Sequence, residues 1–185
     1  MSSAPGRPAP TGSAAMSRLG LGCWAFGGVG AAAPDEAAAR AIMRRAAELG
    51  VNHLDTAADY GDGVSERVVG AAASPRGSYF IATKSQLFAT AAEAEAAVDQ
   101  ARGRLGVDAI DLFYIHWPRK GLDPATMMEG LEACRKKKKL RFVGVSNFSV
   151  ADMEAASRGG RIDYHQLCWN LLWRRPELEI APYCA

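Results

Sequence analysis

The sequence predicts an α/β fold of the (β/α)8 TIM-barrel type, in which about six of the eight βα units are present. Two observations carry this prediction. Short apolar runs of strand length alternate with amphipathic segments of helix length along the 185 residues. Polar side chains also stand at or just after the C-terminal end of five of the predicted strands. A barrel assembles its active site at that edge from many strands, whereas an open doubly wound sheet uses fewer strands at one switch point.

Six runs are predicted to be parallel strands, because they are short and apolar, and several are rich in β-branched or aromatic residues. Their starts are mostly separated by roughly 30 residues, the length of a βαβ unit. The runs are Leu19–Ala25, Val51–Thr56, Tyr79–Thr83, Ile110–Ile115, Phe142–Val145 and Tyr164–Cys168.

Helices between these runs are predicted from apolar residues at helical spacing and from capping residues. Thr90 and Glu93 form a capping-box pattern, and Gly50 and Gly106 stand where two of the helices should stop. A further helix is expected to open within Pro176–Ile180. The residues expected to open the other five helices are Asp35, Ser65, Thr90, Asp123 and Ser149.

The first part of the chain has a different composition from the rest. Residues 1–16 are rich in Pro, Ser, Gly and Ala and carry nothing large to bury. We expect them to form a disordered tail ahead of one barrel domain over residues 17–185, with ordered structure beginning near Leu19.

Charge and cysteine usage narrow the classes of partner and compartment. The net charge is +2, and six of the 22 basic residues lie between Arg135 and Arg141. This run is expected at the C-terminal turn of a helix, where cations are favourable, so neither nucleic acid nor a membrane is predicted as a partner. The four cysteines are scattered, which predicts no metal site and fits a reducing compartment; we expect a cytoplasmic protein.

Four residues near the predicted strand ends could together protonate a carbonyl oxygen. A free tyrosine has a pKa near 10, so Tyr60 is by itself a poor proton donor at neutral pH. An ammonium group at Lys84 would favour the phenolate and lower the tyrosine pKa, and the Asp55 carboxylate would hold that lysine charged. His116 would donate a hydrogen bond to an oxygen on which negative charge develops. The set suits carbonyl reduction.

Taken singly, these residues also have structural interpretations. Asp55 could be a turn residue, and His116 a hydrogen-bonded core histidine. Trp117, Trp169 and Trp173 could pack a core instead of lining an apolar substrate pocket.

A series of motifs in order resembles the aldo-keto reductase family, and in particular its bacterial general reductase branch. The motifs are Val51–Ala57 with Tyr60–Gly61 and Ser65–Glu66, Ala82–Lys84, Ile110–Trp117, Gly144–Phe148 and Asn170–Arg174. The resemblance runs from about Leu19 to the last residue. It implies an oxidoreductase that reduces aldehydes or ketones to alcohols with NADP(H), NAD(H) not being excluded. It also implies a catalytic tetrad of Asp55, Tyr60, Lys84 and His116, with Tyr60 as the general acid.

The same resemblance implies where the cofactor and a small carbonyl substrate would lie. Ser146, Asn147 and Gln166 match positions that hold the nicotinamide carboxamide, and Trp24 follows the first strand where the family contacts the cofactor. The expected cofactor-binding set is Trp24, Asp55, Ser146, Asn147 and Gln166. The expected substrate pocket is formed by Trp24, Tyr60, His116 and Trp117.

Length is the feature that fits this resemblance least. A barrel of this type takes about 250 residues, so strands seven and eight are expected to be missing, with the loop over the pyrophosphate and the residues that select a 2′-phosphate. We therefore expect weak or no cofactor binding by these 185 residues. Open barrel edges also predict self-association.

Three hypotheses about function stay open. The chain could represent a reductase whose full-length parent is active, a truncated fragment or pseudo-enzyme without turnover, or a cofactor-sensing or interaction module that keeps the fold. A Rossmann dehydrogenase is the alternative fold, because Gly20–Ala25 matches a dinucleotide-binding glycine pattern, although a helix does not follow it directly.

Overall fold

The strands form one parallel sheet in the order of the chain. The computed structural model describes residues 15–28, 34–73, 79–86 and 88–185. Neighbouring strands pair in the sequence β1-β2-β3-β4-β5-β6, without any crossover in strand order. Their bounds are β1 Gly20–Gly22, β2 His53–Asp55, β3 Phe80–Ser85, β4 Ile110–Ile115, β5 Leu140–Ser146 and β6 Tyr164–Gln166. This consecutive order is that of a barrel and not of a Rossmann sheet, whose strand order reverses at a central switch point.

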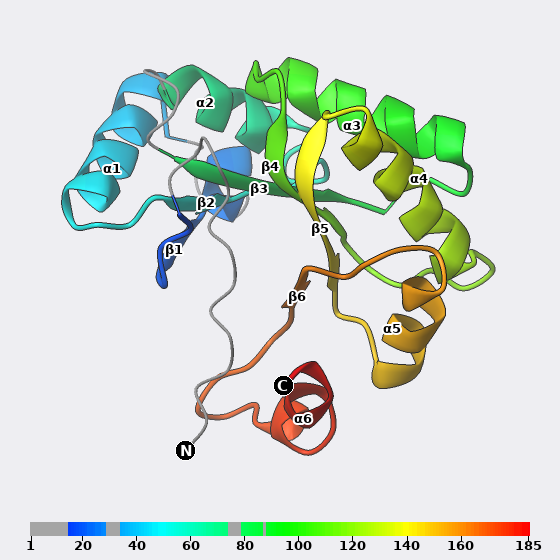
Figure 1. Cartoon of the computed structure of the whole chain (residues 1–185). Helices are drawn as coiled ribbons and strands as arrows, with labels where there is room; N and C mark the ends of the chain where they lie inside the picture. Colours follow the sequence, from blue (N-terminus) through cyan, green and yellow to red (C-terminus); the bar gives the residue numbers. More distant parts are fainter. Residues whose placement is uncertain (1–14, 29–33, 74–78, 87) are drawn as a thin grey trace.

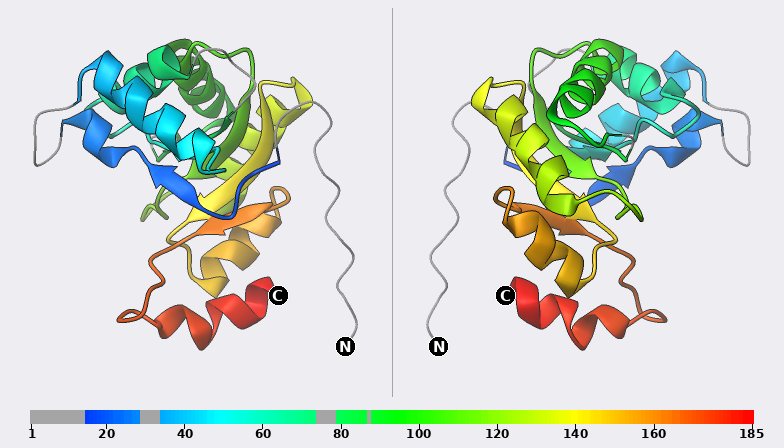
Figure 2. Two further views of the ribbon diagram at one scale, coloured as in Figure 1. Left: turned by 90° about the vertical axis from the view of Figure 1, so that its left-hand side faces the viewer. Right: turned by 90° about the vertical axis from the view of Figure 1, so that its right-hand side faces the viewer.

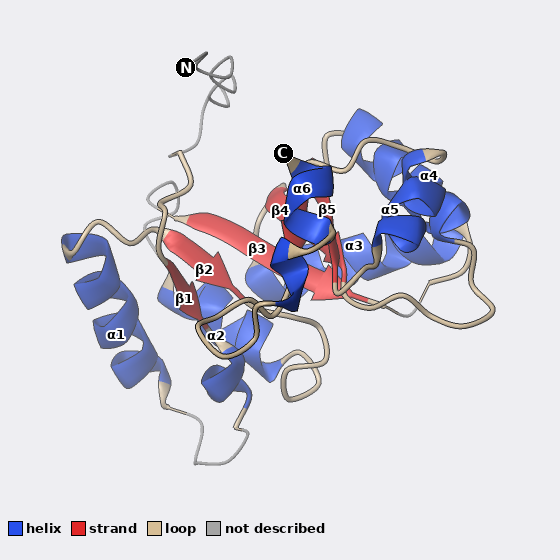
Figure 3. Ribbon diagram, turned by 90° about the horizontal axis from the view of Figure 1, so that it is seen from below, coloured by secondary structure: helices blue, strands red, loops and turns tan. Residues whose placement is uncertain are grey.

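Helices cover the outer face of the curled sheet (Figures 1 and 3). Consecutive helices pack side by side from α1 to α5, as expected when each helix connects two neighbouring parallel strands. Their bounds are α1 Glu36–Glu48, α2 Val64–Ala72, α3 Ala91–Leu105, α4 Pro124–Lys136 and α5 Val150–Ser157. A short helix η1 (Trp24–Gly27) follows β1, and η2 (Arg175–Glu177) and α6 (Ile180–Cys184) follow β6. The predicted α/β class and the incomplete barrel are both confirmed.

Most helix starts agree with the predicted caps. Thr90 and Ser149 each form a reciprocal capping box, and the carboxylates of Asp35 and Asp123 accept hydrogen bonds from backbone N–H groups in the first turn. The predicted cap at Ser65 is wrong. Because Gly63 takes the left-handed conformation and serves as the cap, α2 begins at Val64 and Ser65 lies inside its first turn.

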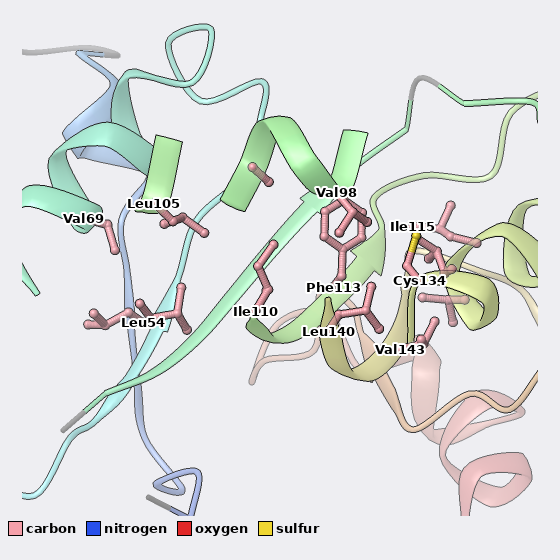
Figure 4. Packing of buried hydrophobic residues seen from close by; sticks show 14 of the residues in the cluster. Leu54, Val69, Val98, Leu105, Ile110, Phe113, Ile115, Cys134, Leu140 and Val143 are labelled. Carbon is pink, nitrogen blue, oxygen red and sulfur yellow. The ribbon is translucent and has the colours of Figure 1, made fainter. Parts of the chain in front are cut away.

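The main hydrophobic core lies between the sheet and its helices. Figure 4 shows strand residues such as Leu54 and Phe113 directed at helix residues such as Val69 and Val98. These side chains are fully buried. The layer fixes each helix against the strand before it, and therefore fixes the loops that join the C-terminal strand ends to the helices.

A second, smaller cluster fills the inner face of the sheet. Phe80, Ala82, Leu112 and Tyr114 are buried there. Large side chains of neighbouring strands therefore cover one another on the concave side of the sheet. The partly buried side chains packed against this cluster are Met16, Phe142 and Tyr164.

Part of the predicted tail contacts this region. The Asn52 side chain donates to the Ala15 carbonyl at 2.9 Å and accepts from the Ser17 N–H at 2.8 Å. Contacts with the barrel therefore begin by Ala15, earlier than the expected start near Leu19. The prediction of disorder for residues 1–14 lies outside the described residues.

The sheet is open at β1 and β6, its two outer strands. Figure 2 shows α6 lying below β6, next to α5 and apart from helices α1 to α4. Large apolar side chains are strongly exposed just after β6, including Leu171 and Leu172, the latter 97% exposed. Within the described ranges, no helix has the length and apolar character needed to cross a bilayer.

The basic run ends α4, as predicted, and packs against acidic residues of α3. Lys137 and Lys139 each place their ammonium group 2.6 Å from a carboxylate oxygen of Glu95, and Lys139 also contacts Asp99 at 2.7 Å. Part of the local positive charge is thus balanced within the fold.

Candidate active site

Polar side chains from five strands meet at the C-terminal edge of the sheet. Residues two apart on a strand share a face, so Lys84 continues the inner face of Phe80 and Ala82, and Ser146 and Gln166 continue the inner faces of their strands. The register places Ser146 directly opposite Gln166. The strand alternation therefore brings the predicted residues to one end of the barrel interior.

Lys84 and Asp55 form a buried ion pair at the centre of this group. The Lys84 ammonium lies 2.9 and 2.8 Å from the two carboxylate oxygens of Asp55 and donates to the Thr56 carbonyl at 3.0 Å. Gln166 also donates to Asp55, at 3.0 Å. The Lys84 side chain is only 2% exposed, yet all three N–H groups of its ammonium have an acceptor. These hydrogen bonds fix the position of the ammonium.

The loop after β2 brings Tyr60 over this ion pair. The Lys84 ammonium lies 4.9 Å from the centroid of the Tyr60 ring, a cation–π contact. The loop passes so close to η1 that a Cβ atom at Gly61 would clash with the Gly27 carbonyl oxygen, and Gly61 has a φ of +62°. Only glycine fits this position, so the turn that presents Tyr60 depends on it.

The pKa of Tyr60 is raised to about 12, opposite to the lowering that the sequence led us to expect. Burial is the largest cause, followed by the negative charges of Asp55 and Asp59. The Lys84 ammonium contacts both carboxylate oxygens of Asp55, so the negative charge of Asp55 acts on the phenol together with the positive charge of Lys84. The phenol therefore stays protonated at neutral pH, the state that a proton donor needs.

His116 lies beside Tyr60, just past β4. The two rings meet edge to face with centroids 6.0 Å apart. Its backbone N–H donates to the Ser85 carbonyl at 2.9 Å, and the Asn147 amide donates to its carbonyl at 3.2 Å. Burial lowers the pKa of the imidazole below its usual 6.5, so His116 is neutral at pH 7.

The side chains expected to hold a carboxamide lie together at the ends of β5 and β6. The Asn147 amide donates to the Ser146 hydroxyl at 3.0 Å, and the Asn147 N–H donates to the Gln166 carbonyl at 2.9 Å. Asn147 has a φ of +61°, a conformation that asparagine tolerates better than most residues. Hydroxyl and amide groups both donate and accept, so this set matches the hydrogen-bonding pattern of a carboxamide.

The tryptophans of the predicted site are only partly buried. Trp24 opens η1 beyond β1 and is 54% exposed, and Trp117 stacks at a tilt on His116 with ring centroids 6.0 Å apart. Trp117 and Trp173 line a hollow of about 590 Å³ next to Asn147. Of the four residues expected in the substrate pocket, only Trp117 lines this hollow in the described part of the chain.

Two features of the site were not predicted from the sequence. Asp59 places a carboxylate oxygen 3.2 Å from Nδ1 of His116. Beneath the site, the fully buried Glu66 accepts a hydrogen bond from the Thr83 hydroxyl at 2.6 Å and pairs with Arg104. Neither shows a spacing pattern in the sequence, because each depends on how a loop or two helices pack.

The predicted cap Ser65 instead has a role below the site. Its hydroxyl lies 2.8 Å from that of Thr56 and donates to the Cys23 carbonyl at 2.7 Å. The Cys23 N–H in turn donates to the Asp55 carbonyl at 2.8 Å. These bonds tie the start of α2 to the ends of β1 and β2.

Comparison with known proteins agrees with this geometry. The sequence model of the Aldo/keto reductase family matches residues 18–185. The chain belongs to that family. It is 36% identical to the aldo-keto reductase YhdN of Bacillus subtilis, over 90% of this chain and 54% of the Bacillus protein. It is 30% identical to the methylglyoxal reductase YeaE of Escherichia coli, over 94% of this chain and 62% of that protein.

Solved structures of the family share the fold. A crystal structure of an aldo/keto reductase from Klebsiella pneumoniae, in complex with NADP and acetate, superposes with a TM-score of 0.82 and 29% identity. The superposition covers 92% of this chain and 61% of that one. The reductase-family chain thus spans between about half and two thirds of the length of the relatives it matches.

Proposed function

We propose that this chain carries the proton-donating side of the active site of an NADP(H)-dependent reductase that converts aldehydes or ketones to alcohols. The observation that carries the proposal is the contact of the buried Lys84–Asp55 pair with the Tyr60 ring, beside His116. Family membership supports the reaction class, and the NADP bound to the Klebsiella relative supports the cofactor.

Proton delivery is the step that the residues of this chain account for. Tyr60 would give its hydroxyl proton to the carbonyl oxygen, and its raised pKa keeps that proton in place until a strongly basic oxygen develops. The Asp55–Lys84 pair would keep the Lys84 ammonium next to the tyrosinate that forms when Tyr60 has given up its proton. His116 would orient the carbonyl from the opposite side.

The cofactor would contact the ends of β5 and β6. Ser146, Asn147 and Gln166 supply the donors and acceptors that a carboxamide needs, and Trp24 offers an exposed aromatic face near β1. A bound NADP(H) would supply the hydride for the carbonyl carbon. Asp55 would act on the bound cofactor indirectly, because it accepts a hydrogen bond from the Gln166 amide.

The substitution Tyr60→Phe tests the general acid. In a chain extended through strands seven and eight, we expect it to lower the rate of NADPH-dependent reduction of methylglyoxal, the aldehyde in the name of the Escherichia coli relative, by at least about 100-fold. NADPH binding, followed by tryptophan fluorescence, should change little, because the ring stays in place. Tyr79→Phe is the matched control, since Tyr79 precedes the opposite end of β3 from Lys84. Wild-type turnover in Tyr60→Phe would show that the proton comes from another group.

A further inference from the structure

The two nitrogens of His116 face different surroundings, and one of them meets a carboxylate. Oδ2 of Asp59 lies 3.2 Å from Nδ1 of His116. Nδ1 is buried and has no aligned hydrogen bond in the part of the chain that the structure describes. The Asp59 side chain is 46% exposed, so its carboxylate reaches the ring from the solvent side of the loop.

A carboxylate in this place decides where the proton of a neutral imidazole resides. A neutral imidazole carries one N–H, and an ionised carboxylate can only accept. An unprotonated Nδ1 would set its lone pair against a carboxylate oxygen at 3.2 Å, which is repulsive, whereas a protonated Nδ1 is attracted. The other nitrogen, Nε2, then carries a lone pair and has no hydrogen to donate.

We infer that Asp59 is a positioning residue that keeps the proton of neutral His116 on Nδ1, so that Nε2 donates to a carbonyl oxygen only when the ring is doubly protonated. The inference rests on the proposed function, because a carbonyl oxygen is the group that His116 would bind. It makes the site most effective under mildly acidic conditions.

The charged and titratable groups around the ring set how acidic those conditions are. Asp59 and the more distant Asp55 favour the doubly protonated ring, whereas Lys84 opposes it. The Tyr60 ring packs against it edge to face and brings no charge at neutral pH. Burial is the largest effect and lowers the pKa of His116 below 6.5. The doubly protonated form is therefore gained as the pH falls through that region.

The tautomer can be read directly by ¹⁵N NMR of histidine-labelled protein, without cofactor or substrate. The chain has three histidines, and His116→Gln assigns the signals of His116 by removing them. At pH 8 or so, we expect Nδ1 protonated and Nε2 unprotonated in the wild type. In Asp59→Ala we expect the proton to move to Nε2. Asp62→Asn, which removes an exposed carboxylate from the same loop, should leave the signals unchanged.

Activity gives a second, independent readout. In a chain extended through strands seven and eight, methylglyoxal reduction by the wild type should fall between about pH 5.5 and about pH 8, by up to roughly tenfold per pH unit once His116 loses its second proton. In Asp59→Ala the profile should be nearly flat over this range, so the variant should exceed the wild type at the alkaline end. Asp62→Asn should keep the wild-type profile.

Two results would overturn the inference. One is a wild-type spectrum with the proton on Nε2, which is decisive even if a variant does not fold. The other is a pH profile that Asp59→Ala leaves unchanged. Absence of turnover in every protein, with the tautomer as expected, would instead count against the proposed reductase function and leave the role of Asp59 standing.

Discussion

Lys84 is a charged side chain that the fold has removed almost entirely from water. Three oxygens surround its ammonium, two from Asp55 and one from the Thr56 backbone. A buried charge is tolerated only when its partners are fixed, so the geometry of the proposed site and the stability of the fold depend on the same contacts.

Substitution of Lys84 by methionine tests this dependence. The variant keeps an unbranched side chain that lacks the ammonium group, and of the hydrogen bonds described above it leaves Asp55 with the one from the Gln166 side chain. Because removal of one partner from a buried pair strands the other, we expect the free energy of unfolding to fall by about 3 kcal/mol. Urea denaturation measures the loss. Lys137→Met, at an exposed pair, should cost far less; equal losses would mean that burial of the pair contributes nothing.

At this scale the sequence predicted which residues meet, but not their protonation. Strand ends and the Tyr60 loop were enough to group Asp55, Lys84 and His116 with Tyr60. The direction of the Tyr60 pKa shift was not predictable, because it depends first on the burial of the phenol and then on the charges of Asp55 and Asp59. Both depend on how the loop packs, as does the nearness of Asp59 to His116.

Helices α2 and α3 are fastened to β3 by one buried carboxylate. Glu66 of α2 binds both Thr83, which directly precedes Lys84, and Arg104 of α3. The Arg104 side chain also packs on Gly63, where a Cβ atom would lie 2.5 Å from its Cδ. The contacts of Glu66 and Arg104 thus fix the start of α2 against α3 and β3. They thereby also fix the end of the loop that carries Tyr60.

Glu66→Gln tests this fastening. Glutamine can still accept the Thr83 hydrogen bond, but it leaves the Arg104 guanidinium without its buried counter-charge. We expect a loss on the order of 3 kcal/mol in the free energy of unfolding, measured by urea denaturation. Glu48→Gln, at an exposed pair within α1, is the control. A Glu66 variant as stable as this control would contradict the proposed role.

Elements were predicted better in their order than in their ends. Capping residues marked four helix starts, because a cap is a local bond between neighbours in sequence. The strands β1 and β2 are shorter than the apolar runs that predicted them. An apolar run indicates which residues are buried, but it does not indicate where the hydrogen bonds between neighbouring strands end. In the first run, Trp24–Gly27 turns into η1.

At the scale of the molecule, three histidines are removed from solvent to different degrees: His116 is buried just past β4, and His53 in β2 and His165 in β6 are partly buried. Burial lowers the pKa of His53, His116 and His165. The unfolded chain therefore takes up more protons than the folded chain as the pH falls below about 6.5. Their contribution to stability is complete above that pH and is lost as the pH falls through the lowered values.

Acid sensitivity should follow from these histidines. We expect the urea midpoint to fall between about pH 7.5 and about pH 5.5, before most carboxylates titrate. The double substitution His53→Gln with His165→Gln should reduce that fall, because it removes two of the partly buried imidazoles. Both residues lie outside the proposed catalytic group, so the substitution leaves that group intact. An unchanged or rising midpoint on acidification would contradict the burial of the imidazoles. Self-association through the β1 and β6 edges stays a prediction, which sedimentation can test.

The hydrogen bond from Gln166 to Asp55 joins residues that are 111 positions apart. Contacts between distant parts of a chain form late in folding, because a long loop must close first. Three intervening strands must be in place before β6 can bring its glutamine to β2. Newly made chains would therefore complete the surroundings of Asp55 only at the end of folding, which makes this bond a natural reporter of the last docking event.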